Sequence, residues 1–143
     1  MAGYFRKLNG HVYNGEFTAA EKLQNGVFVE ITTDGVKKIA GTKDTILRVA
    51  DKTTLWGMDA LVLDVVTTGN DEVFFVENEW DINDNEDYDT AKYECKVGNL
   101  VKMRRPTVGD QLIMTVENTL YSSLNTSDMV QPAANGTVAK KVG

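Results

Sequence analysis

The chain has 143 residues, of which 42% are hydrophobic and 25% are charged, and its formal net charge is −6. This mixture is typical of a globular domain and excludes the low hydrophobicity and high charge of an intrinsically disordered chain. No apolar run approaches the roughly 20 residues that a membrane-spanning helix needs, so we expect no membrane partner. The single cysteine, Cys95, cannot form an intramolecular disulfide. We therefore expect one domain that folds without disulfides.

Tight-turn dipeptides divide the chain into short segments. Asn-Gly and Asp-Gly favour two-residue hairpin turns because they tolerate positive φ angles, and they occur at 9–10, 14–15, 25–26, 34–35 and 135–136. In chain order, apolar runs and period-two alternation predict strands at 27–31, 36–40, 45–50, 60–66, 73–76, 93–97, 101–104 and 112–116. The runs at 60–66, 73–76 and 112–116 are apolar on both faces, which is typical of central strands.

Helix signals are few. Thr18 and Glu21 form a capping box that predicts one or two helical turns over 18–23. Residues 122–130 fit either a short helix or a loop. The sequence therefore predicts a mainly β fold, a small β-barrel or β-sandwich with one or two short helices and extended termini. We expect an N-terminal arm at 1–17, a β-rich core domain at 18–129 and a C-terminal tail at 130–143, which either pairs as a strand or stays free.

An acidic stretch, WDINDNEDYDTAK at 80–92, begins like a calcium-binding EF-hand loop. Oxygen-bearing side chains stand at its alternate positions, namely Asp81, Asn83, Asn85, Asp87 and Asp89. Glu86 occupies the place of the glycine that the loop requires, and Lys92 replaces the bidentate glutamate, so the stretch is not an EF-hand. A calcium site of another kind, an acidic docking surface and a solvated loop between strands stay open. Apart from this calcium ion, we expect no cofactor.

Signatures of catalysis are missing from the sequence. It contains no phosphate-binding loop, dinucleotide-binding turn, zinc-protease helix or hydrolase elbow. His11 and Cys95 form a catalytic dyad only if the fold brings them together, and Cys95 lies on the apolar side of its predicted strand, where we expect it to be buried. Glu77 and Glu79 alternate on one strand face, as a glycosidase pair could. Strand-face acids are common, so we expect no enzymatic activity.

The basic segment KMRRP at 102–106 is the best candidate for contact with nucleic-acid phosphates. The sequence pI near 4.7 opposes a binding surface of useful size. Aromatic residues are also not interleaved with these bases, as base stacking would require. We therefore expect no nucleic-acid partner.

The segments LNGHVYNGEF…GVFVEI near the start, PTVGDQLIMTVEN, and QPAANGTVAKK near the end carry a family resemblance. With the overall pattern of strands and tight turns, they resemble small auxiliary capsid proteins of tailed bacteriophages, which decorate or cement the outside of the head. The resemblance spans most of the chain. It implies a β-rich virion protein that binds the major capsid protein, frequently as a homotrimer, and it carries over no catalytic or cofactor residue.

The leading hypothesis is thus a non-enzymatic virion structural protein that binds the outer capsid surface and stabilises or decorates the head. Tyr4, Phe5 and Tyr13 are the candidate anchors for the partner, since aromatic side chains often lie at interface centres; the alternative is that they pack on the domain's own core. A second hypothesis is a small β-barrel that binds carbohydrate or protein in a bacterial or phage surface apparatus. A third is an enzyme that uses clustered acids such as Glu77 and Asp81.

Overall fold

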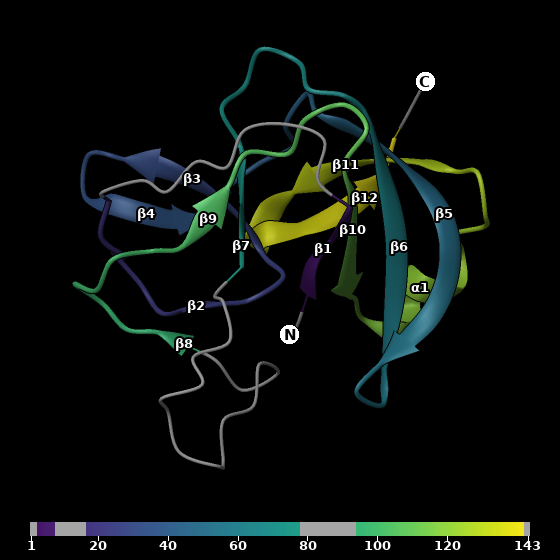
Figure 1. Cartoon of the computed structure of the whole chain (residues 1–143), viewed down its shortest axis with the longest axis horizontal. Coiled ribbons are helices and arrows are strands. Elements are labelled where there is room, and N and C mark those ends of the chain that lie inside the picture. Colours follow the sequence, from purple (N-terminus) through teal and green to yellow (C-terminus); the bar gives the residue numbers. More distant parts are fainter. Residues whose placement is uncertain (1–2, 8–16, 78–93, 142–143) are drawn as a thin grey trace.

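The computed structural model describes residues 3–7, 17–77 and 94–141, which form two antiparallel sheets and a short two-stranded ribbon (Figure 1). The larger sheet has the order β1 (Gly3–Lys7), β10 (Gln111–Thr115), β6 (Met58–Thr67), β5 (Ile46–Leu55), β11 (Met129–Ala133) and β12 (Thr137–Lys140). The smaller sheet has the order β4 (Gly35–Lys38), β3 (Phe28–Thr32), β7 (Phe74–Val76) and β9 (Met103–Arg104). The ribbon pairs β2 (Leu23–Gln24) with β8 (Glu94–Cys95). The predicted mainly β fold is confirmed.

The main core lies between the two sheets. From the six-stranded sheet it takes the alternate residues of its long strands, such as Leu61 and Leu63 of β6, and from the four-stranded sheet it takes Phe28 and Phe75. The two phenylalanine rings pack with their centroids 5.0 Å apart. Because period-two alternation sends successive side chains to opposite faces of a strand, one face of β6 fills this core and its other face is turned away from it.

A second core lies on the other face of the four-stranded sheet. Phe74 and Val76 of β7 point into it, and the ribbon covers it with Leu23 and Cys95. Figure 1 shows β2 and β8 beside the smaller sheet and away from β5 and β6. Strand β7 is therefore buried on both faces, as its continuous apolar run predicts.

The capping-box prediction for 18–23 is wrong. Thr18 and Ala19 make isolated bridges with Leu100 and Val36, and Leu23 begins β2. A helix of one or two turns has too few hydrogen bonds to offset the cost of its nucleation by itself, so it forms only where packing favours it. Burial of Ala19 and Leu23 in the second core favours extended pairing instead.

The helix α1 (Asn118–Ser123) begins before the predicted candidate at 122–130 and overlaps only its first two residues. It follows β10 directly and packs Leu120 and Tyr121 against the main core. Among the described residues, no helix is long and apolar enough to cross a membrane.

Both predicted termini contribute strands to the six-stranded sheet. β1 pairs with β10, and the hairpin of β11 and β12 pairs with β5. Val130 and Val138 of this hairpin are buried in the main core. The boundary predicted at 129/130 cuts through β11, and of the two alternatives for the C-terminal tail the structure shows strand pairing, while residues 3–7 of the predicted arm form the edge strand β1.

Candidate binding surface and pocket

The β5–β6 hairpin turns through two residues, Trp56 and Gly57, between the paired Leu55 and Met58. Both turn residues have positive φ angles, 48° and 79°, as a primed hairpin turn requires. For a residue with a Cβ atom this left-handed conformation costs about 1–2 kcal/mol. Trp56 is nevertheless 51% exposed, so about half of its surface stays in contact with water.

Tyr4 lies on the same face of the large sheet as the residues that are paired with it on the neighbouring strands. It pairs with Ile113 of β10, which in turn pairs with Val62 of β6, and directly opposed residues project to the same side. Ile113 and Val62 belong to a small apolar cluster separate from the main core. Tyr4 therefore lies on the face of the large sheet that is turned away from the core.

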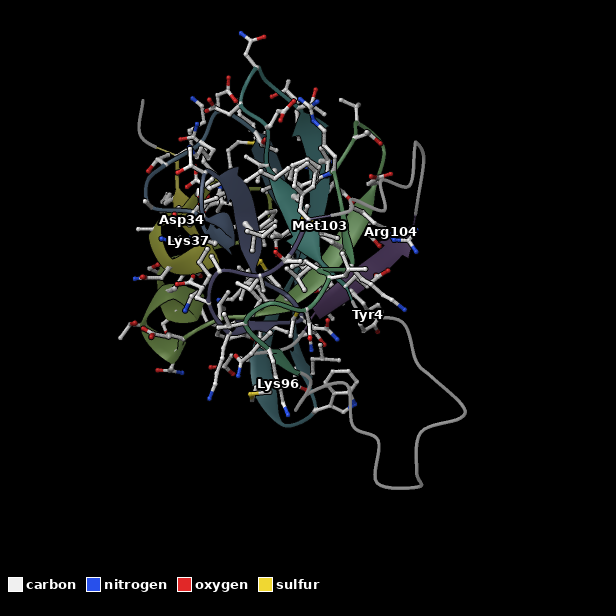
Figure 2. The ribbon with its side chains drawn as sticks, turned by 90° about the vertical axis from the view of Figure 1, so that its left-hand side faces the viewer. Tyr4, Asp34, Lys37, Lys96, Met103 and Arg104 are labelled. Atoms are coloured by element: carbon white, nitrogen blue, oxygen red, sulfur yellow. The ribbon has the colours of Figure 1, made fainter. Side chains whose placement is uncertain are left out.

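Tyr4 and Trp56 come together as an exposed aromatic pair, which we call the aromatic pair from here on. Their ring centroids are 6.5 Å apart with an interplanar angle of 50°, within the range of tilted aromatic contacts. Tyr4 is 38% exposed, and Figure 2 shows it beside β1 at the surface. The pair thus offers two large aromatic rings to solvent at one place.

Phe17, Val97 and Leu100 form a second group of exposed apolar side chains, which we call the apolar rim. The backbone N–H of Val101 donates to the carbonyl of Phe17, and Gly98 N–H donates to Ala19 O, so the segments that carry these side chains are tied together.

A pocket of about 680 Å³ opens beside the β5–β6 turn. It lies among the start of β6, the segment that joins β10 to α1, and the turn η2 (Ala134–Gly136) with the start of β12. Its lining residues are Gly57, Met58, Asp59, Thr115, Val116, Glu117, Leu120, Asn135, Thr137 and Val138. The pocket thus combines apolar side chains with two carboxylates.

Asp59 is held at this pocket by two hydrogen bonds. Its Oδ2 accepts from Asn118 Nδ2 at 3.0 Å, and its backbone carbonyl accepts from Val116 N–H at 2.9 Å. Glu117, the residue before α1, stands between these two partners in the chain and is exposed. The two carboxylates are therefore carried by adjoining segments.

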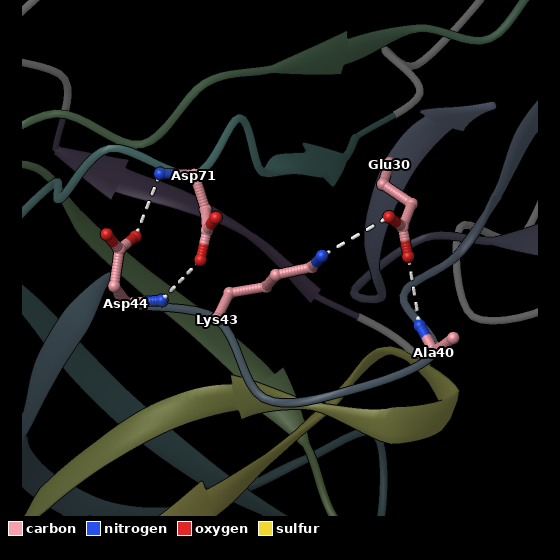
Figure 3. A network of polar contacts seen from close by, with 5 residues as sticks. All are labelled: Glu30, Ala40, Lys43, Asp44 and Asp71. Carbon is pink, nitrogen blue, oxygen red and sulfur yellow. Dashed lines mark hydrogen bonds and ion pairs between the residues drawn. The ribbon is translucent and has the colours of Figure 1, made fainter.

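A separate polar network clamps two loops together (Figure 3). The Asp44 carboxylate accepts hydrogen bonds from the backbone N–H groups of Asn70 at 2.7 Å and Asp71 at 2.9 Å, and Asp71 Oδ2 accepts from Asp44 N–H at 3.0 Å. The bond from Asn70 N–H is the largest cause of a lowered Asp44 pKa. Next to it, Lys43 Nζ lies 3.3 Å from Glu30 Oε1. Because backbone donors and a lysine already engage these acids, we interpret them as a loop clamp.

Among the described residues, no three or more His, Cys, Asp or Glu side chains are grouped as a metal ion would require. The predicted calcium ligands lie outside the described residues, and they are Asp81, Asn83, Asn85, Asp87 and Asp89. Tyr13, His11 and Glu79 also lie outside them, as does the side chain of Phe5, whose backbone belongs to β1. The calcium site and the three aromatic anchors therefore stay predictions, and of the anchors the structure places only the side chain of Tyr4, which is exposed.

The remaining candidates have defined surroundings. Cys95 is buried, as predicted, and its Sγ lies 3.4 Å from the carbonyl oxygen of Leu100. Glu77 Oε1 lies 3.2 Å from Arg104 Nε, and both side chains are largely buried, with 14% and 13% exposed. Glu77, a candidate catalytic acid, is therefore paired with Arg104 of the KMRRP segment. Lys102 of the same segment is exposed.

Sequence reasoning missed Trp56 and the pocket. The glycine at 57 between two apolar runs was an available turn signal, although Trp-Gly is not a typical hairpin pair. Nothing local indicates that Trp56 meets Tyr4 or that Asp59 lies near Glu117, because these contacts depend on strand pairing.

A comparison with protein-family models, with curated proteins and with solved structures finds no match to this chain.

Proposed function

We propose that this protein is a non-enzymatic virion structural protein that binds the outer surface of a tailed-phage capsid through the major capsid protein and stabilises or decorates the head. The resemblance to auxiliary capsid proteins supports the assignment to the virion. The observation that carries the binding role is the aromatic pair, Tyr4 and Trp56, exposed on the large sheet.

The position of Trp56 supports a binding role on energetic grounds. A bulky residue in the left-handed region is strained, and such strain tends to persist where it serves function. Glycine or asparagine would occupy the same turn position with less strain. Tryptophan and tyrosine are also the residues that most often dominate protein interfaces. An exposed tryptophan beside a tyrosine is thus better explained by a partner than by the stability of the isolated domain.

The homotrimer is part of the same proposal. The apolar rim of Phe17, Val97 and Leu100 is a surface that self-association would remove from water. A trimer presents three aromatic pairs to the capsid lattice, and linked weak contacts bind much more strongly than one. Sedimentation of the protein alone measures its oligomeric state.

The test is co-sedimentation of purified protein with heads of the phage that encodes it, after removal of the resident copies. We expect saturable, stoichiometric pelleting. Trp56→Ala should weaken binding about 30-fold, as loss of a 2 kcal/mol hot spot would. Met129→Ala is the matched control, because Met129 is also exposed but starts β11, on the far side of the sheet from β1.

No pelleting at micromolar protein would refute the capsid role, and equal binding by both variants would refute the role of the aromatic pair. In the first case the second hypothesis takes over, a small carbohydrate- or protein-binding module of a bacterial or phage surface apparatus. The same exposed rings favour it, and binding of the isolated domain to immobilised glycans or candidate proteins, lost in Trp56→Ala, would support it.

A further inference from the structure

The pocket beside the β5–β6 turn has two chemically distinct parts. Val116 and Val138 are buried and Leu120 is half-buried, so they form apolar walls. Asp59 and Glu117 supply carboxylates from adjoining segments, tied together through Asn118 and Val116. An apolar wall next to charged acceptors suits a ligand that is itself apolar along its length and cationic at its end.

The charge of the pocket is one-sided. Among the described residues that line it, two are acidic and none is basic. The Asp59 carboxylate accepts a hydrogen bond from the neutral amide of Asn118, and this bond does not compensate its negative charge. Lys52 lies over the ring of Tyr121, 4.3 Å from its centroid, and Lys140 is paired with Asp128 at 3.6 Å. An anionic ligand is therefore disfavoured and a cationic ligand is favoured.

We propose that this pocket binds the side chain of a lysine or arginine from the partner protein. The aliphatic stem packs on Val116, Leu120 and Val138, and the ammonium or guanidinium group donates hydrogen bonds to Asp59 and Glu117. Charge complementarity identifies this occupant, since a carboxylate that accepts hydrogen bonds from a cationic donor makes one of the stronger polar contacts in proteins.

The location of the pocket connects this inference to the proposed function, on which it rests. Trp56 directly precedes Gly57, Met58 and Asp59, all three of which line the pocket. A protein that covers the Trp56 ring therefore lies within reach of the pocket mouth. The volume of about 680 Å³ also accommodates a long side chain together with part of its backbone.

The test is an NMR titration of the full chain with N-acetyl-lysine N-methylamide, followed through the backbone amides of 57–59, 115–118 and 135–138. The uncharged comparison ligand is the norleucine analogue, which keeps the stem and lacks the ammonium group. We expect saturable shifts of the pocket amides with the lysine compound, weakened by several hundred millimolar salt. We expect no saturable shifts with norleucine.

Three variants sharpen the test. Asp59→Asn and Glu117→Gln should each weaken lysine binding roughly tenfold, because a hydrogen bond to a charged group contributes on that scale. Glu72→Gln removes an exposed acid after the opposite end of β6 and is the matched control for net charge, with no expected effect. If Asp59→Asn does not fold, Glu117→Gln still tests the proposal, because Glu117 is exposed and its substitution should leave the fold intact.

Equal shifts with lysine and norleucine, or unchanged lysine affinity in Glu117→Gln, would overturn the proposal. The titration contains no capsid, so its failure is separate from a failure of the head-binding experiment. If the pocket binds lysine but the protein does not pellet with heads, the pocket still takes a basic side chain, and that side chain belongs to a partner other than the capsid.

Discussion

Alanine substitutions at two glycines isolate the energetic cost of the β5–β6 turn. A Cβ atom at Gly57 would meet nothing within 4 Å, and the same is true at Gly41. The two sites differ in backbone conformation, because Gly57 has a φ of 79° whereas Gly41 lies outside the left-handed region. Any difference between the two variants therefore reports backbone conformation rather than a steric clash.

The magnitude follows from this geometry. Gly57→Ala should lower the free energy of unfolding by about 1–2 kcal/mol, the cost of placing a Cβ in the left-handed region. Gly41→Ala should raise it by about 0.4–1 kcal/mol, because alanine restricts the unfolded chain more than glycine does. The two variants should thus differ by about 1.4–3 kcal/mol, a large share of the total of about 5–15 kcal/mol for a typical domain.

Equilibrium urea unfolding, followed by circular dichroism, measures both values. We expect the transition midpoint to fall for Gly57→Ala and to rise for Gly41→Ala, with an unchanged slope m, since neither change alters the surface exposed on unfolding. Midpoints that move in the same direction by the same amount would refute the left-handed conformation at Gly57. They would also remove the strain argument for Trp56, which occupies the same turn.

Two further predictions concern the core and the loop clamp. Phe28→Leu and Phe75→Leu, singly and combined, should give a coupling energy of about 0.5–1.5 kcal/mol in a double-mutant cycle, because their rings contact one another in the main core. Strictly additive changes in the free energy of urea unfolding would contradict this contact. Asp44→Asn should destabilise the protein at neutral pH, and the gap to the wild type should close as the pH falls. The Asp44 pKa is lowered in the fold, so its contribution is present above the unfolded pKa of about 3.9 and is lost as the pH drops through the folded value. Urea unfolding between pH 7 and pH 3, with the exposed Asp34→Asn as control for lost surface charge, measures this gap, and a gap independent of pH would contradict the clamp.

The sequence alone determined most of the strands. Apolar alternation and continuous apolar runs are local properties of the chain, and they located β3, β4, β6, β7 and β10 to within two residues at each end, whereas β5 continues to Leu55, five residues beyond the predicted end at 50. The same reasoning placed Cys95 on a buried strand face, which the structure confirms. These predictions succeed because the side-chain period of a strand directly records which face is buried.

Tertiary structure decided the parts that depend on a distant partner. The capping signal at 18–23 is local, but Thr18 and Ala19 pair with Leu100 and Val36 instead of forming a helix. Residues 3–7 and 129–133 are strands because they pair with β10 and β5. The candidate sites have the same origin. Register between β1 and β10 sets Tyr4 near Trp56, and the packing of α1 beside the start of β6 sets Glu117 near Asp59. A sequence pattern reports the burial of one segment, but the meeting of two segments far apart in the chain is fixed only when their strands pair and their side chains pack.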